Sequence, residues 1–204
     1  MSILTGELLV AVSSYLIGSI PSSYVMGKLL KGIDLREHGS GNLGAANTFR
    51  ILGAKAAVPV LLFDVGKGFI AVKYFSDFGG EAFYFPLVAA FFVVFGHNYS
   101  VFVRFSGGKG VGATTGAFIA LAPFAVLLSF ILWVAVLLFS RIVSLASMIA
   151  AAFLPFAILI SNRLLGADTH ISITVLATVV AIVVIYKHKS NIRRLREGTE
   201  KRIF

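Results

Sequence analysis

Cysteine is absent from this chain of 204 residues, and histidine occurs only four times. The absence of cysteine excludes disulfides, thiolate metal ligands and a cysteine nucleophile. The histidines form no His-x-x-x-His or His-Glu pair of the kind that marks a helical metal site. We therefore expect neither a metal ion nor another cofactor.

Charged residues are also scarce, at 13% of the chain, whereas 58% of the residues are hydrophobic and the mean hydropathy is +0.93. This balance lies far outside that of soluble domains. The chain is therefore predicted to be an all-α, polytopic integral membrane helix bundle. The apolar stretches are Leu4 to Leu30, Ala56 to Phe75, Phe83 to Phe95, Ala113 to Phe139, Ile142 to Ile160 and Ile171 to Tyr186. No separate soluble domain fits between them, so residues 1–204 are predicted to form a single transmembrane domain.

The first apolar stretch is predicted to stay in the mature protein as a helix. A signal peptide would need a basic start, a shorter apolar run and a small-residue cleavage site, whereas "GKLLKG" follows this stretch.

The net charge of +9 is explained by the membrane alone. Seven of the 18 basic residues lie between Lys187 and Arg202, and the only aromatic residue after Tyr186 is Phe204. No platform for stacking bases is visible there, so we expect no nucleic acid. Basic residues collect in the cytoplasmic loops of membrane proteins. This rule places the N-terminus outside, and it places residues 31–53, residues 97–111 and the C-terminal tail in the cytoplasm.

An outside N-terminus and a cytoplasmic C-terminus require an odd number of crossings. The run from Ala113 to Phe139 would be about 40 Å long as one helix, compared with an apolar core of about 30 Å. Pro123 lies near its middle, where a helix breaks or kinks. Division at Pro123 gives seven transmembrane helices, which we favour. Five is the alternative, because Phe83 to Phe95 is short for a crossing.

Two patterns within the apolar stretches concern packing. Asp64 and Lys67 are three residues apart on one helix face, and unpaired charges at mid-membrane are costly. We expect them to pair, either as a structural pair or as part of a site lining. Ser14, Gly18 and Ser22 form a stripe of small residues that is typical of a contact between helices.

Three polar segments are rich in groups that bind anions. They read "HGSGNLGAANTFR", "GHNYSVFVRFSGGKGVGATTG" and "KHKSNIRRLREGTEKR". Gly and Asn allow backbone N–H groups to face a ligand, and Ser, Lys and Arg add side-chain donors. The G-x-G-x-x-G spacing in the first segment is not a dinucleotide site, because it lacks the strand–loop–helix context. Ordinary turn chemistry is the alternative for the first two segments.

In this order the three segments resemble the motifs of the bacterial acyl-phosphate:glycerol-3-phosphate acyltransferases, the PlsY family, and "RIVSLAS" between the second and third is similar too. The resemblance implies a plasma (inner) membrane enzyme with its active site towards the cytoplasm. Such an enzyme moves a fatty acyl group from acyl phosphate to the 1-hydroxyl of glycerol 3-phosphate, giving lysophosphatidic acid and phosphate in the first step of phospholipid synthesis. It uses no cofactor. Its partners would be both substrates, membrane lipid and the upstream enzyme that forms acyl phosphate.

The resemblance assigns roles by motif position. The residues assigned to catalysis are Ser40, Arg50, Lys109, His188 and Asn191. The residues assigned to substrate binding are Asn42, Asn47, His97, Gly107, Gly108, Gly110 and Ser147, and Glu200 is assigned a structural role.

We expect direct attack by the hydroxyl without an acyl-enzyme, because an acyl phosphate already has a good leaving group. His188, His97 or a phosphate oxygen of the donor is the candidate proton acceptor. A transporter or channel for organic phosphates is the alternative function, since Gly-rich breaks at membrane depth also form anion sites.

Overall fold

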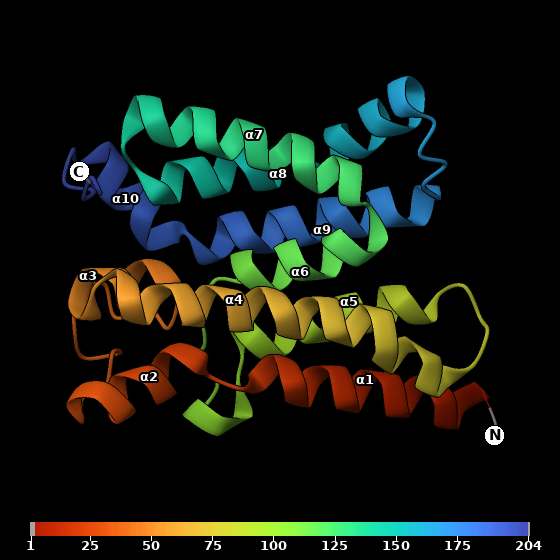
Figure 1. The fold of residues 1–204 in the computed structure, drawn as a ribbon, viewed down its shortest axis with the longest axis horizontal. Coiled ribbons are helices and arrows are strands. Elements are labelled where there is room, and N and C mark those ends of the chain that lie inside the picture. The colour runs from red at the N-terminus through yellow and green to blue at the C-terminus, as the bar shows by residue number, and fades with distance from the viewer. Residues whose placement is uncertain (1–2, 204) are drawn as a thin grey trace. The chain divides into compact units, whose positions relative to one another are not determined.

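The computed structural model describes residues 3–203, and every regular element in that range is a helix (Figure 1). This confirms the predicted all-α class. The chain divides into two compact units, Met1–Ala120 and Leu121–Phe204. The helices up to the end of the first unit are α1 (Ile3–Ser19), α2 (Ser22–Lys31), α3 (Ala45–Leu52), α4 (Ala54–Ile70), α5 (Phe85–Asn98) and α6 (Val111–Leu121). The second unit contains α7 (Pro123–Ser140), α8 (Val143–Leu165), α9 (Ile171–Lys187) and α10 (Lys189–Arg196).

The first apolar stretch is broken at Pro21, where a single helix was expected. Proline has no N–H to donate and its ring clashes with the preceding turn. Accordingly α1 ends at Ser19 and α2 begins at Ser22. The break leaves carbonyl groups that need other donors. Ser100 Oγ donates to the carbonyl of Ser19, and Lys67 Nζ donates to the carbonyl of Ile20 at 3.0 Å.

Glycines allow the helices of the first unit to approach one another closely. An added Cβ at Gly18 of α1 would lie 2.3 Å from the carbonyl oxygen of Val93 in α5, so this residue of the predicted small-residue stripe does form a helix contact. A Cβ at Gly116 of α6 would lie only 1.8 Å from the carbonyl oxygen of Val65 in α4. Membrane helices have little hydrophobic force between them and associate through such close packing.

In the second unit α7 packs along α8, and α8 packs along α9. As predicted, the long apolar run is divided at Pro123, which is the first residue of α7. The preceding α6 has 11 residues, which corresponds to about 16 Å, roughly half the apolar core.

Among residues 3–203, four segments are long and apolar enough to cross a membrane, namely Ile3–Lys31, Phe85–Val103, Pro123–Ser140 and Val143–Leu165. A fifth is formed if α9 and α10, which are bent by 57°, count as one span. The 17 residues of α4 continue directly into a π-helix, Ala71–Phe75. These helices confirm an integral membrane protein, while seven crossings and the orientation of the termini stay predictions.

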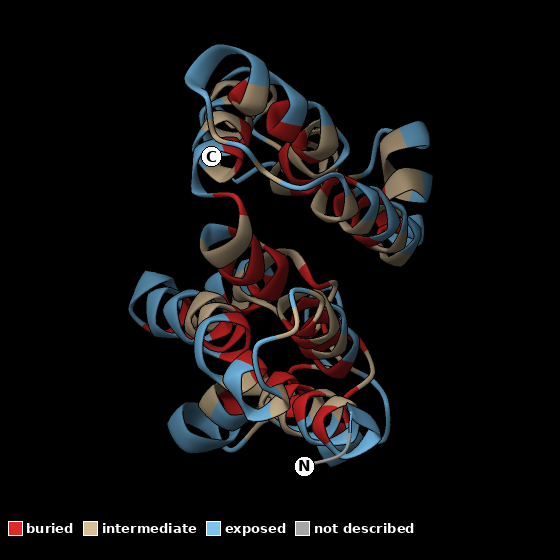
Figure 2. Ribbon diagram, turned by 90° about the vertical axis from the view of Figure 1, so that its right-hand side faces the viewer, coloured by how far each residue is buried: buried red, intermediate tan, exposed pale blue. Residues whose placement is uncertain are grey.

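Burial within each unit fits lipid surroundings. Buried residues lie where the helices of a unit face one another, and many are Ala, Gly or Ser (Figure 2). Large apolar side chains are exposed on the outside, for example Leu62 and Phe139. A soluble domain would place these large side chains in its core.

The contact between α4 and α6 can be tested by adding one methyl group. Gly116→Ala would place Cβ against the backbone of Val65, and we expect overpacking to destabilise the protein by about 1–3 kcal/mol. Thermal unfolding of the purified protein in detergent measures this change. Gly66→Ala is the matched control, because a Cβ at Gly66 meets nothing within 4 Å. Equal midpoints for both variants would contradict the close contact.

Candidate functional site

The first polar segment forms a loop that is held by one asparagine. Asn47, on α3, is 2% exposed. Its Oδ1 accepts a hydrogen bond from the backbone N–H of Ser40 at 2.9 Å, and its Nδ2 donates to the carbonyls of Leu35 and His38. Gly39 and Gly41 adopt the left-handed conformation that this tight path requires. The side chain of Asn47 therefore anchors the backbone of Ser40 to α3.

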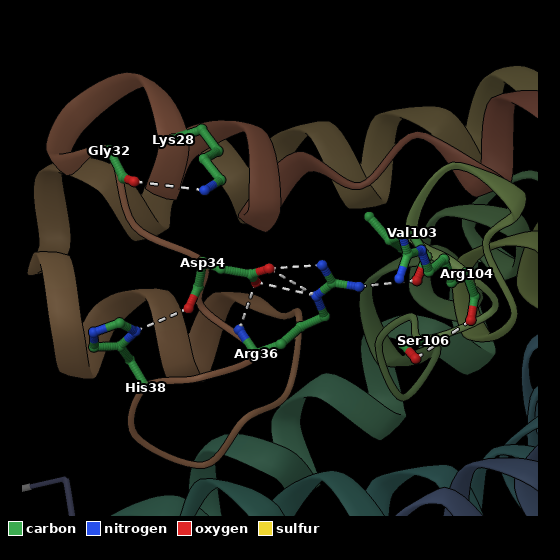
Figure 3. A network of polar contacts seen from close by, with 8 residues as sticks. All are labelled: Lys28, Gly32, Asp34, Arg36, His38, Val103, Arg104 and Ser106. Carbon is green, nitrogen blue, oxygen red and sulfur yellow. Dashed lines mark hydrogen bonds and ion pairs between the residues drawn. The ribbon is translucent and has the colours of Figure 1, made fainter.

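A hydrogen bond from Arg36, which is itself paired with Asp34 just before the first loop, joins this region to the second polar segment (Figure 3). Arg36 Nη2 lies 2.6 Å from Asp34 Oδ2, and Arg36 Nη1 donates to the carbonyl of Val103 at 3.1 Å. The hydrogen bonds from Arg36 lower the pKa of Asp34 below its usual value. Beneath this pair, Leu35, Leu43 and Val103 form a small buried cluster. The two loops are thus tied together by a hydrogen bond and by apolar packing.

The second loop packs on His97 through two glycines. Its Gly108 N–H donates to the carbonyl of His97 at 2.9 Å. An added Cβ at Gly107 would lie 2.1 Å from that carbonyl oxygen, and one at Gly108 would lie 2.2 Å from His97 Nε2. Neither position has room for a side chain. The loop then reaches Lys109 and Gly110 immediately before α6, so Lys109 lies at a helix N-terminus, where the helix dipole favours anions.

A buried pair of charges lies beside these glycines. Asp64 Oδ1 is 2.8 Å from Lys67 Nζ, which confirms the predicted pairing on α4. The same oxygen accepts a hydrogen bond from Ser22 Oγ at 2.8 Å and lies 3.6 Å from His97 Nδ1. Both charged side chains are at most 4% exposed. Since α4, the start of α2 and α5 all contribute, this network joins three helices.

These groups surround a small cavity in the first unit. It is lined by Ser19, Ile20, Pro21, Ser22, Leu43, Asp64, Lys67, His97, Ser100, Gly107 and Gly108. The structure therefore brings together three predicted site residues, His97, Gly107 and Gly108, with an ion pair whose role was left open.

The third polar segment forms a separate cluster in the second unit. Glu200 accepts hydrogen bonds from Ser144, Asn191 and Arg194, at 2.7, 2.6 and 2.6 Å. Burial alone would raise the pKa of Glu200, but these three bonds together lower it below its ordinary value of 4.5. The carboxylate thus fixes the amide of Asn191.

His188 and Ser147 have defined partners in the same unit. His188 is buried, and its Nδ1 lies 2.7 Å from the carbonyl oxygen of Val184. A carbonyl only accepts, so Nδ1 carries the proton, and Nε2 of the neutral ring is then an acceptor. Ser147 Oγ accepts a hydrogen bond from Trp133 Nε1 at 3.2 Å.

The remaining predicted residues lie outside the cavity. Arg50 is exposed on α3, Ser40 is exposed in the first loop, and Asn42 is half-buried there. Within residues 3–203, no group of three or more His, Asp or Glu side chains could hold a metal ion.

Sequence reasoning missed two serines and undervalued one pair. Ser22 had been assigned to helix packing, and Ser144 had no assigned role, yet each donates to a carboxylate. For Asp64 and Lys67 a signal was present, since two charges three residues apart in an apolar stretch must be paired. Their contact with His97 depends on the packing of α4 and α5.

Comparison with known proteins gives full-length matches. The family model described as glycerol-3-phosphate acyltransferase matches residues 8–198. The chain is 43% identical to glycerol-3-phosphate acyltransferase 2 of Moorella thermoacetica, with 96% of this chain and 97% of that protein covered. It is 41% identical to glycerol-3-phosphate acyltransferase of Carboxydothermus hydrogenoformans, with 96% of both covered.

Solved structures agree with these relatives. The crystal structure of PlsY (YgiH), an integral membrane glycerol 3-phosphate acyltransferase in its glycerol 3-phosphate form, is similar with a TM-score of 0.85 and 38% identity. The match covers 97% of this chain and 96% of that one. The lysophosphatidic acid form of the same protein has a TM-score of 0.82.

The Glu200 cluster predicts a pH-dependent stability difference. Since folding lowers the pKa of Glu200, its carboxylate stabilises the protein above pH 4.5, and this contribution is lost as the pH falls through the folded pKa. At pH 7 we expect Glu200→Gln to lose about 1–3 kcal/mol, because hydrogen bonds to a charged group are weakened or broken. Thermal unfolding in detergent at pH 7 and near pH 3.5 measures the difference, which should shrink at the lower pH.

Glu197→Gln is the matched control for this experiment. Its ion pair with Arg193 lies on an exposed face of α10, with side chains 50% and 81% exposed, so it should change stability by less than about 1 kcal/mol. A pH-independent effect of Glu200→Gln would contradict the role of the carboxylate charge.

Proposed function

This chain belongs to the glycerol-3-phosphate acyltransferase family, and we propose that it transfers a fatty acyl group from acyl phosphate to the 1-hydroxyl of glycerol 3-phosphate. The products are lysophosphatidic acid and phosphate. We place the enzyme in the bacterial inner membrane with its active site towards the cytoplasm, where it would receive acyl phosphate from the enzyme that forms it. The three motifs support acyl phosphate as the donor, and the absence of a His-x-x-x-x-Asp acid–base signature agrees with it.

One observation carries the proposal. In the first unit the two glycine-rich loops are tied together, and the second ends in a lysine at the N-terminus of α6. Loop N–H groups, an ammonium and a helix terminus are the donors that phosphate binding requires. Lys109 and Arg50 therefore hold substrate phosphates, and Gly107, Gly108 and Gly110 allow the backbone to approach them.

The other predicted residues orient the reacting groups. Ser40 and Asn191 donate hydrogen bonds to substrate, Nε2 of His188 accepts one, and Asn42 and Ser147 contribute further polar groups. Asn47 does not contact substrate. Its side-chain amide forms hydrogen bonds with the loop backbone and holds Ser40 in place. Glu200 is structural and holds the amide of Asn191.

The reaction proceeds by direct attack. The 1-hydroxyl oxygen bonds to the acyl carbonyl carbon, the bond from that carbon to the phosphate oxygen breaks, and phosphate leaves with the electron pair. The hydroxyl proton passes to Nε2 of His188 or to a phosphate oxygen of the donor. Both substrates are anions, so cationic donors would stabilise the charge that develops on the carbonyl and leaving oxygens.

The reaction itself is tested with purified protein in detergent. Phosphate release should require acyl phosphate and glycerol 3-phosphate together, and lysophosphatidic acid should appear in equal amount. Uptake of glycerol 3-phosphate into vesicles without turnover would instead indicate a carrier. Turnover with acyl coenzyme A but not acyl phosphate would overturn the proposed donor.

Lys109→Ala should reduce kcat/KM by about 100-fold or more, because it removes an ammonium from the proposed phosphate site. Lys109→Arg should also fail, since a planar guanidinium does not replace a compact ammonium where geometry is tight. Steady-state kinetics with each substrate varied in turn measures both effects.

Lys55→Ala is the matched control for Lys109→Ala, because Lys55 is exposed at the start of α4 and has no proposed part in the reaction. It should keep near-normal turnover. Equal activity of the Lys109→Ala and Lys55→Ala proteins would contradict the assignment of Lys109.

The proton acceptor is tested at the third segment. If Nε2 of His188 takes the hydroxyl proton, His188→Ala should lower kcat by about 100-fold to 10,000-fold with little change in glycerol 3-phosphate binding. A loss of only a few-fold, with binding intact, would assign the proton to a phosphate oxygen of the donor. Trapping of an acylated Ser40 or Ser147 would contradict direct attack.

A further inference from the structure

The buried pair Asp64 and Lys67 has no part in the reaction described above, yet it lines the same cavity as the glycines of the second loop. A carboxylate and an ammonium this deep in apolar helices are rarely kept for stability alone, since a well-packed apolar pair is often at least as stable. Intramembrane charges commonly mark a functional site. What these charges contact therefore indicates what they do.

Contacts lead from the carboxylate to the proposed phosphate loop in two steps. Asp64 Oδ1 faces His97 Nδ1 at 3.6 Å, on one edge of the imidazole ring. The other edge faces the loop, because a methyl group at Gly108 would lie 2.2 Å from His97 Nε2. The backbone of His97 is also engaged, since its carbonyl accepts the Gly108 N–H at 2.9 Å.

The ring of His97 thus fills the space beside Gly108, and the carboxylate of Asp64 lies 3.6 Å from its other nitrogen. Lys67 balances the carboxylate charge and binds the carbonyl of Ile20 at the helix break, so it anchors the other side of Asp64. Ser22 donates to the same carboxylate oxygen from the start of α2. The carboxylate is therefore restrained by α2 and α4, and through His97 it contacts the loop.

We propose that Asp64 and His97 are positioning residues that hold the Gly107–Lys109 loop in the conformation that binds a substrate phosphate, an inference that rests on the proposed function of that loop. They act through the loop and do not touch the reacting atoms. His97 is 7% exposed, and an added Cβ at Gly108 would lie 2.2 Å from its Nε2. The ring is therefore close enough to the loop to support it.

The test separates positioning from stability by neutralising the pair in two steps. Asp64→Asn leaves Lys67 without its charged partner, so the variant should be less stable. The double variant Asp64→Asn/Lys67→Met has no unpaired buried charge, and its thermal midpoint should return towards that of the wild type. Neither variant restores the carboxylate that holds His97.

We expect affinity and stability to respond differently. In both the Asp64→Asn and the double variant, KM for at least one of the two phosphate substrates should rise by about tenfold to 100-fold, the size of effect that a misplaced binding group produces. His97→Leu moves no buried charge and should show the same rise. If Asp64→Asn alone does not fold, the double variant and His97→Leu carry the test.

Tyr84→Phe is the matched control. It removes a hydrogen bond to Glu7 within the same unit, about 18 Å along α1 from Ser19. Both KM values should stay within about twofold of the wild type, because this bond is remote from the loop. The inference is overturned if KM recovers together with stability in the double variant. It is also overturned if a folded double variant or His97→Leu keeps both wild-type KM values.

Direct binding distinguishes this result from a failure of the proposed reaction. Titration calorimetry of the detergent-solubilised protein with glycerol 3-phosphate, and separately with inorganic phosphate, needs no acyl donor and no turnover. Wild-type binding without turnover of acyl phosphate would refute the proposed donor and leave the positioning role open to the same variants. Binding that is equal in the wild type and in all three variants would refute the positioning role whatever the reaction.

Discussion

The arrangement of the first unit depends on how the chain satisfies the carbonyl groups left at Pro21. In apolar surroundings each backbone group without a hydrogen-bond partner costs several kcal/mol of stability. The backbone N–H of Ser22 and the ammonium of Lys67 both donate to the carbonyl of Ile20, and an ammonium at that depth needs a carboxylate. Asp64 supplies it and is thereby placed beside His97, which supports the second loop. Contacts of Lys67, Asp64 and His97 thus link the helix break to the second loop.

Hydrogen bonds to backbone groups also fix the two glycine-rich loops. Besides the apolar cluster of Leu35, Leu43 and Val103, specific bonds fix them: from Asn47 for the first loop, from Arg36 between the two, and to the carbonyl of His97 for the second. Each partner engages backbone groups. Ordering the backbone in this way before a ligand arrives reduces the entropy lost on binding. Glu200 has the same effect on Asn191 in the second unit.

Local rules predicted much of this protein, and contacts distant in sequence account for the rest. Hydropathy predicted the helices, the proline rule predicted the division at Pro123, and i,i+3 spacing predicted the Asp64–Lys67 pair. The same proline rule applies at Pro21, but there the long apolar run favours one continuous helix, and the structure shows a break. No local pattern indicates that Ser22 or His97 reaches Asp64, because both contacts require α2, α4 and α5 to be packed together. Donor geometry explains the Gly107–Gly108 sequence in part, and the structure adds a steric reason, namely the backbone of His97 at Gly107 and its ring at Gly108.

The position of Asp64 and Lys67 on a single helix also bears on how the protein is made. Partners on different helices would each have to enter the bilayer as an isolated charge and wait for the other helix. Partners one turn apart meet as soon as α4 has formed, so the segment can leave the translocation channel as a nearly neutral unit. Assembly of the bundle then only has to replace residual water around the pair with Ser22, His97 and the carbonyl of Ile20. The spacing of three residues therefore lets Asp64 and Lys67 pair within α4 before the helices pack together.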